Sequence, residues 1–328
     1  MMKKYLIFLL CIITLGCTHT TNENKTTSTL KVATTIYPLT YFTQQIGGQY
    51  VNTTQLVQDE ADIHNYKLTV NALNTAQKSD LVLYIDPTLE PYTLDLTSII
   101  DEQHIPSINM LAEVKKQTAP EIGQGQTLIS GTLTVEESSG QSPTFPKHKD
   151  GRSEQTLSKA YNHLWLHPSY AIIMCEIIKN ELTAFRPEYE AIFQANYNQL
   201  KEKLLTLNQA FESLSDAPNK YFITTHDAFS TWQSYGLIQI PILDYYENEL
   251  PQQELQQLIN ASLTLNLYYL FQEPNIHSSV IEQIQNSLNL ESIPLYTLAT
   301  LTEEQIQNGD DYFTIMYENI NHLKRELY

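Results

Sequence analysis

The chain contains few cysteines: three among 328 residues, at positions 11, 17 and 175. Cys11 lies in an apolar leader that we expect to be removed, and Cys17 is a candidate site for lipid attachment, so Cys175 alone would remain in the folded protein. One cysteine cannot form an internal disulfide. The fold must therefore be stabilised by its own apolar core, in which the segment "YAIIMCEII" predicts a packed thiol.

Positive charge is also scarce. The chain has 19 Lys and Arg against 37 Asp and Glu, a formal net charge of -18. Binding of nucleic-acid phosphates requires a surplus of Lys and Arg, so the composition argues against a nucleic-acid partner. An acidic surface suits a soluble protein, and it also concentrates cations.

The apolar run near the N-terminus, residues 5–15, is too short to cross a bilayer core of ~30 Å. It follows two lysines and ends at "TLGC", which resembles the cleavage box of bacterial lipoproteins. We therefore expect residues 1–16 to be a signal peptide and Cys17 to carry a lipid anchor, with ordinary secretion as the alternative. The polar residues 17–29 are typical of a flexible tether. These features predict a protein of the cell envelope, anchored to the membrane and facing the periplasm or the exterior.

Short apolar runs such as "DLVLYID" and "KYFITT" alternate with helical patterns, which predicts an α/β fold with mainly parallel sheets flanked by helices. The length favours two lobes over one enlarged core. We expect an N-terminal α/β lobe at residues 30–167, with a mobile loop at 113–158, and a C-terminal α/β lobe at 219–328. The helical region between them, residues 168–218, contains apolar residues at spacings of three and four over 187–216, which predicts one long helix that joins the lobes.

Three histidines lie at the ends of predicted elements. His64 precedes a helix, His163 lies just ahead of the next helical region, and His226 follows the strand "YFITT". Ligands of open α/β sheets usually bind near strand ends, and here the cleft between the lobes is the expected place. A lone histidine beside an apolar strand is more often a hydrogen-bonded core residue, so position alone leaves both interpretations open.

Several segments resemble a known family in the same order and spacing: "KVATTIYPLTYFTQQIGG", "DIHNYKLT", "NHLWLHP", "ITTHDAF" and "FQEPNIHSSVIEQI". They resemble the zinc/manganese-type solute-binding lipoproteins of bacterial ABC importers, from about residue 30 to 328. The resemblance implies a monomer, not an enzyme, that captures a divalent transition metal and delivers it to an ABC permease in the membrane. It also implies that His64, His163 and His226 are the metal ligands.

The resemblance favours Zn²⁺ over Mn²⁺, because manganese-type members carry a carboxylate at the third ligand position and this chain has His226. Imidazole suits zinc, and harder oxygen ligands suit manganese. Three imidazoles leave one tetrahedral position. Relatives often fill it with an acidic residue at the position of Tyr296, or with one next to the first histidine, where this chain has Ile63. Asp62 is one position away, so the fourth ligand is left open between Tyr296, Asp62 and water.

Two other functions are compatible with the same residues. A zinc-dependent hydrolase with a three-histidine site would need a general base, for which Glu273 in "FQEPN" is the candidate. A surface adhesin with a structural metal is the second alternative. His167 is expected to face solvent or to cap a helix. The predicted loop contains only His148, so we do not expect it to gather metal as the histidine-rich loops of relatives are thought to do.

Overall fold

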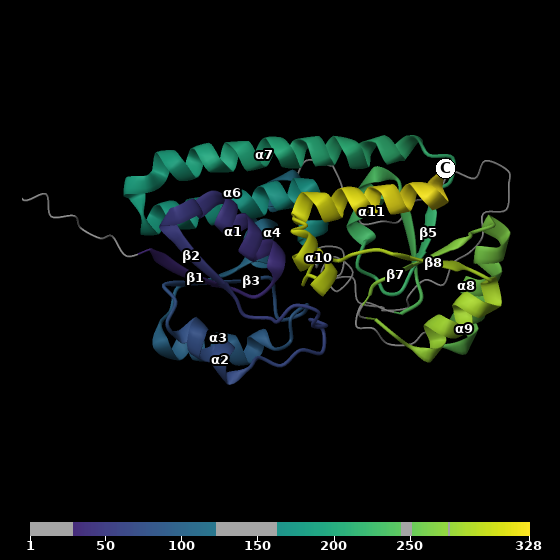
Figure 1. Ribbon diagram of the computed structural model, residues 1–328, viewed down its shortest axis with the longest axis horizontal. Helices are drawn as coiled ribbons and strands as arrows, with labels where there is room; N and C mark the ends of the chain where they lie inside the picture. Colours follow the sequence, from purple (N-terminus) through teal and green to yellow (C-terminus); the bar gives the residue numbers. More distant parts are fainter. Residues whose placement is uncertain (1–28, 123–162, 244–250, 275) are drawn as a thin grey trace, which may run out of the picture.

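The computed structural model describes residues 29–122, 163–243, 251–274 and 276–328. Two α/β lobes lie side by side, and one long helix, α7 (Glu190–Glu212), runs along both of them (Figure 1). The expected fold class is confirmed. The predicted leader, the tether up to residue 28 and Cys17 lie outside the described residues. Within the described ranges, no helix is both long enough and apolar enough to cross a membrane.

The first lobe contains a four-stranded parallel sheet in the order β2-β1-β3-β4. Its strands are β1 (Leu30–Thr34), β2 (Val51–Gln55), β3 (Leu81–Tyr84) and β4 (Ser107–Asn109), and its helices are α1 (Tyr37–Gly47), α2 (Val70–Gln77), α3 (Thr93–Gln103) and α4 (Met110–Ile122), with a 3-10 turn, η1 (Gly48–Tyr50), before β2. All four residues of β3 are buried, because α2 and α3 cover one face of the sheet and α1 lies on the other (Figure 1). Val82 packs with the α2 and α3 residues Ala72 and Leu96, while Leu81 and Leu83 belong to the main core.

The second lobe repeats this arrangement with the strand order β6-β5-β7-β8, also parallel. Its strands are β5 (Tyr221–Thr224), β6 (Ile238–Pro241), β7 (Tyr269–Gln272) and β8 (Glu291–Pro294), and its helices are α8 (Gln252–Leu265), α9 (Ser279–Leu288), α10 (Glu303–Asn308) and α11 (Tyr312–Leu327), with a 3-10 segment, η5 (Ser230–Tyr235), after β5. Ile223 and Leu270 face a separate apolar cluster with α8 and α9. Phe222 and Phe271 face the other way, into the core that α11 covers.

The two lobes share one core through the helical region between them. Helix α6 (Pro168–Phe185) is followed by a helical backbone over residues 187–216, which consists of η3 (Pro187–Tyr189), α7 and η4 (Ser213–Asp216). The buried side chains of α7 form one stripe at spacings of four and three: Phe193, Tyr197, Leu200, Leu204, Leu207 and Phe211. This stripe packs in a cluster that contains residues of both α1 and α11, so one apolar core runs from the first lobe to the second.

The predicted loop at 113–158 is wrong at its beginning. Helix α4 continues to Ile122, because Met110, Leu111 and Val114 pack into the core and Asn109 Oδ1 accepts the N–H of Ala112 at 2.9 Å near the start of the helix. The rest of that loop, from residue 123, lies outside the described residues. The division of the chain into leader, tether, lobes and linking region remains a prediction.

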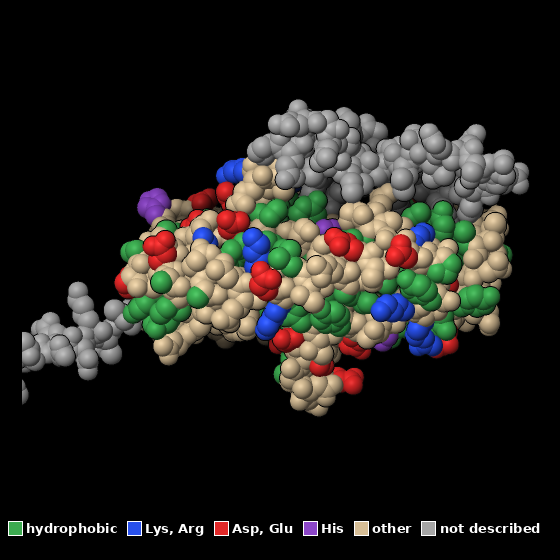
Figure 2. Space-filling model, turned by 90° about the horizontal axis from the view of Figure 1, so that it is seen from above, with side chains coloured by type: hydrophobic (Ala, Val, Ile, Leu, Met, Phe, Trp, Pro, Cys, Tyr) green, Lys and Arg blue, Asp and Glu red, His purple; other side chains and the backbone are tan. Residues whose placement is uncertain are grey.

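Figure 2 shows acidic and basic side chains interspersed along the face that carries α7. Neither sign gathers into a large patch on this face. Among the described side chains of this face, the surplus of acidic residues therefore does not form a single charged surface, and the basic ones form no stripe of the kind that binds nucleic acid.

Candidate metal site

His64 lies in a turn between β2 and α2, at the carboxyl end of the first sheet. The carboxylate of Asp62 holds this turn: Oδ1 accepts the N–H of His64 at 2.8 Å, and Oδ2 accepts the side-chain amide of Asn65 at 2.8 Å. An Asp that bonds the backbone two residues further on is a common way to fix a turn. The local sequence "DIHN" therefore positions the histidine.

His163 precedes a 3-10 turn, η2 (Leu164–Leu166), whose three residues are fully buried. The turn is attached to the second lobe. Trp165 Nε1 donates to the carbonyl oxygen of Thr297 at 2.5 Å, and Trp232 Nε1 donates to the carbonyl oxygen of Leu166 at 2.8 Å. Both tryptophans are thus core residues with satisfied N–H groups, and they fix His163, which is only 2% exposed.

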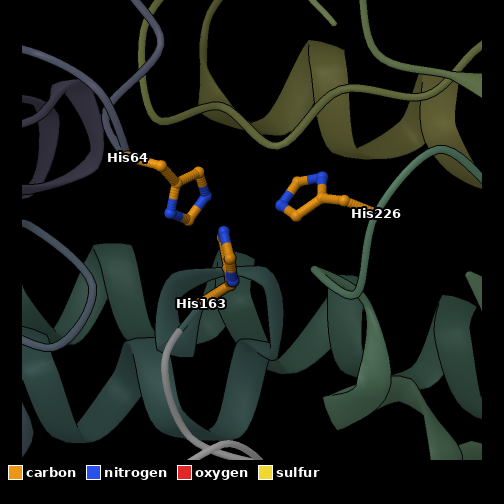
Figure 3. A group of neighbouring side chains, drawn as sticks. All are labelled: His64, His163 and His226. Atoms are coloured by element: carbon orange, nitrogen blue, oxygen red, sulfur yellow. The ribbon is translucent and has the colours of Figure 1, made fainter. Parts of the chain in front are cut away.

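His226 follows β5 and is 1% exposed. Its carbonyl oxygen accepts Gln239 Nε2 at 2.6 Å and Thr224 Oγ1 at 3.0 Å, which ends the strand in a defined bend. Its ring Nδ1 contacts Glu273 Oε1, which also accepts Thr225 Oγ1 at 3.0 Å. With Nδ1 on the Glu273 side, Nε2 is the nitrogen on the side of the other two histidines (Figure 3).

The three rings meet between the lobes. Each offers a nitrogen, and these nitrogens lie within 4.8 Å of one another. The ring centroids are 5.2 Å apart for His64 and His226, 5.5 Å for His163 and His226, and 5.7 Å for His64 and His163. Figure 3 shows the rings converging on one point from three separate segments. Zn–N bonds are about 2.0–2.1 Å long, which places the nitrogens of a tetrahedral site about 3.4 Å apart. Nitrogens separated by up to 4.8 Å therefore have to approach one another by about 1.5 Å or less to bind one ion.

The environment keeps the imidazoles of His64 and His163 neutral. Burial, and then the neighbouring His226, lowers the pKa of His64 to about 4 against the opposing effect of Asp62. Burial, followed by His226 and His64, lowers the pKa of His163 well below its ordinary value. A metal binds only the deprotonated ring, so His64 and His163 are already in the binding form at neutral pH.

The two protein candidates for the fourth position both line the pocket that contains the histidines. The carboxylate of Asp62 is hydrogen-bonded within its own turn. Burial, followed by Glu318, Glu304 and Asp310, raises the pKa of Tyr296 to about 12, so its phenol is neutral. Among the described His, Cys, Asp and Glu residues, the group whose donor atoms lie within 4.8 Å of one another consists of the three histidines.

Glu273 has a role that the sequence does not indicate. It was a candidate general base, and the structure places it against the ring of His226. The register explains why: β5 pairs with β7 so that Thr224 lies opposite Phe271, and continuing by two residues brings His226 opposite Glu273. The two residues end neighbouring parallel strands, and this signal is readable only once the strand pairing is known.

His167 caps a helix but does not face solvent. Its Nδ1 accepts the N–H of Ser169 at 3.3 Å, at the start of α6, and its Nε2 lies 2.8 Å from Ser234 Oγ. The ring is 7% exposed and stacks on Tyr235 with a centroid separation of 4.7 Å. The expectation of a cap is confirmed and that of exposure is wrong, because η5 of the second lobe covers the ring.

The fold and this site define a two-lobed α/β protein with a candidate ion site between its lobes. The family model of ZnuA, zinc-uptake complex component A, periplasmic, matches residues 32–326. The chain belongs to this family, which confirms the resemblance seen in the sequence.

Two curated relatives illustrate the similarity. The chain is 26% identical over 327 residues to the zinc-binding lipoprotein AdcA of Streptococcus pneumoniae (strain ATCC BAA-255 / R6), an alignment that covers 99% of this chain and 61% of AdcA. It is 23% identical over 301 residues to the high-affinity zinc uptake system protein ZnuA of Bacillus subtilis (strain 168), which covers 91% of this chain and 88% of that protein. The chain thus spans about 61% of the length of its streptococcal relatives.

Solved structures share the fold. The Zn(II)-bound ZnuA-like domain of Streptococcus pneumoniae AdcA superposes with a TM-score of 0.66 at 23% identity, covering 91% of this chain and 99% of that one. The laminin-binding protein of Streptococcus agalactiae, described as an adhesin with metal-transporting activity, superposes with a TM-score of 0.68 at 19% identity, covering 91% and 100%. At these identities the similarity shows the fold alone.

Proposed function

We propose that this protein captures Zn²⁺ outside the cytoplasm and delivers it to an ABC permease. The observation that carries the proposal is the meeting of three imidazoles, from three separate segments, in one pocket between the lobes. Imidazole nitrogen suits zinc better than manganese, and the names of the curated relatives support the same metal.

In this proposal, His64 from the first lobe, His163 from the turn before α6 and His226 from the second lobe bind the ion. Glu273 is a positioning residue. It accepts the proton of His226 Nδ1, which fixes the tautomer in which Nε2 carries the lone pair for the metal. Asp62 positions His64 through the backbone of its turn.

The distribution of the ligands over the lobes suits capture followed by release. His64 and His226 belong to different lobes, so separating the lobes would split the ligand set and weaken binding. A permease that stabilises the separated arrangement would thereby receive the ion. A lipid anchor at Cys17, outside the described residues, would hold the protein near that permease; stable anchoring takes more than one acyl chain.

The hydrolase and adhesin alternatives have less support. The carboxylate of Glu273 is bonded to His226 and Thr225, which suits positioning better than activation of a water. The likeness to a laminin-binding protein is one of fold. Zinc titration of the mature protein, followed by an ester-hydrolysis assay on the loaded form, separates these functions. One tightly bound Zn²⁺ per chain without turnover supports the carrier, whereas turnover that depends on zinc would contradict it.

Replacing Glu273 with alanine is expected to lower the affinity for Zn²⁺ by about 10–100-fold, the usual effect of removing the partner of a ligating histidine. Glu273→Gln should recover much of this loss, because an amide oxygen also accepts the Nδ1 proton. Isothermal titration with Zn²⁺ measures both. Glu282→Ala, at an exposed position on α9, serves as the control and should bind like the unmodified protein. Equal affinity of Glu273→Ala and the control would contradict the positioning role.

A further inference from the structure

The pocket continues beyond the three histidines along one segment of the second lobe. Besides the rings, its lining includes Tyr296, Ile276, Thr300, Thr302 and Gln305. Apart from Ile276, these residues lie between the end of β8 and the first turn of α10, and they present hydroxyl and amide groups. This part of the pocket forms a recess beside the rings.

Gln305 is the residue in this recess whose hydrogen bonds point to a ligand. It is 5% exposed, and its Oε1 accepts the N–H of Thr302 at 2.9 Å while Thr302 Oγ1 accepts the N–H of Gln305 at 3.2 Å. This reciprocal cap identifies the amide oxygen, and therefore the amide nitrogen. Gln305 Nε2 is buried and has no hydrogen-bond partner among the described residues. A buried donor of this kind is costly unless something accepts its proton.

The coordination of the site leaves a position for that acceptor beside the ion. The three imidazoles supply three of the four donors of a tetrahedral Zn²⁺ site. The two carboxylates that line the pocket, those of Asp62 and Glu273, are hydrogen-bonded to other groups of the protein. Tyr296 is a neutral phenol. A bound ion would therefore keep an open fourth position, which a ligand with a second acceptor oxygen fills while that oxygen accepts the N–H of Gln305 Nε2.

We propose that the pocket binds Zn²⁺ together with a small carboxylate. This inference rests on the zinc binding proposed above. One carboxylate oxygen displaces water from the fourth position of the ion, and the carboxylate accepts the N–H of Gln305 Nε2. The protein then recognises zinc that carries an organic acid, and Gln305 is a residue that determines this specificity.

The test uses Co²⁺ in place of zinc, because the d–d absorption of Co²⁺ reports its coordination, and acetate as the probe. Loading the mature protein with Co²⁺ should give one bound ion per chain. Adding acetate should then change the d–d bands saturably, while sodium perchlorate at the same ionic strength should not. Failure to bind Co²⁺ or Zn²⁺ would overturn the proposed function itself. Normal metal binding with no response to acetate would overturn only the carboxylate site, leaving water as the fourth ligand.

Two variants test whether the response of the Co²⁺ d–d bands to acetate depends on Gln305. Gln305→Glu keeps the reciprocal cap, because Glu is also favoured at this position, but replaces the N–H donor by an anionic oxygen. Gln305→Met keeps the side-chain length and removes the donor without adding charge. Each should bind acetate about 10-fold more weakly or worse, with the fold checked by thermal melting. Gln256→Glu, the same charge change at an exposed position on α8, should respond like the unmodified protein. A wild-type response in both Gln305 variants would overturn the assignment.

Discussion

Replacing His226 with alanine is expected to lower the affinity for Zn²⁺ by about 100-fold or more, beyond the 10–100-fold that changes of outer residues cause. The ring is the one ligand from the second lobe, and its loss leaves only the donors of His64 and His163. Two imidazoles cannot complete a tetrahedral site without two further donors. Isothermal titration of the mature protein with Zn²⁺ measures the loss.

Two companion variants make this result interpretable. His226 is buried and bonded to Glu273, so its removal also weakens the fold locally. His64→Ala tests the same site from a partly exposed turn, where loss of the ring disturbs packing less, and it should lose affinity to a similar extent. His277→Ala, at an exposed position, should bind like the unmodified protein. Unchanged affinity in His64→Ala would exclude the three-histidine site.

Zinc binding is expected to persist in mildly acidic solution. Protons and Zn²⁺ compete for the same ring nitrogens, and an ordinary histidine takes up its proton near pH 6.5. Burial depresses the pKa of His64 to about 4 and that of His163 well below its ordinary value. The His64 ring therefore stays available to the metal above pH 4, and the affinity due to it is lost only as the pH falls through about 4. The His163 ring, whose pKa is also depressed, likewise stays available in mildly acidic solution.

The release of protons on binding gives the sharpest test of this prediction. At pH 5.5, two histidines with ordinary pKa values would be about 90% protonated and would release nearly two protons when zinc binds. The buried rings of His64 and His163 should release almost none. Titration calorimetry in buffers with different ionisation enthalpies counts the protons. Release of two or more, together with a steep fall in affinity between pH 7.5 and 5.5, would contradict the depressed values.

The fold could be predicted from the sequence where the pattern of apolar residues is long and regular. The apolar stripe of α7 has an unbroken spacing, and the region 187–216 is helical throughout. Strands such as β3 are short, but they are apolar on both faces, which is typical of a covered parallel sheet. The continuation of α4 into residues 113–122 was not predictable in the same way. Its segment is polar, and the contacts of Met110, Leu111 and Val114 with the core hold its start.

The residues of the candidate site also differ in whether the sequence alone predicts them. The three histidines could be proposed from the resemblance, because each lies in a local motif. The functions that we propose for Glu273 and Gln305 depend on tertiary structure: the first on the register between β5 and β7, the second on the recess in the pocket. Neither can be read from spacing along the chain. For His167 the sequence left solvent exposure and a helix cap open for the same reason, since the ring is covered by η5, whose Ser234 lies 67 positions later in the chain.

A zinc-edge anomalous diffraction map of crystals grown with Zn²⁺ tests the central claim most directly. We predict one strong peak between the lobes, at bonding distance from nitrogens of His64, His163 and His226, with a non-protein oxygen as the fourth donor. A map with no peak among the three rings, or with the ion bound elsewhere on the acidic surface, would contradict it.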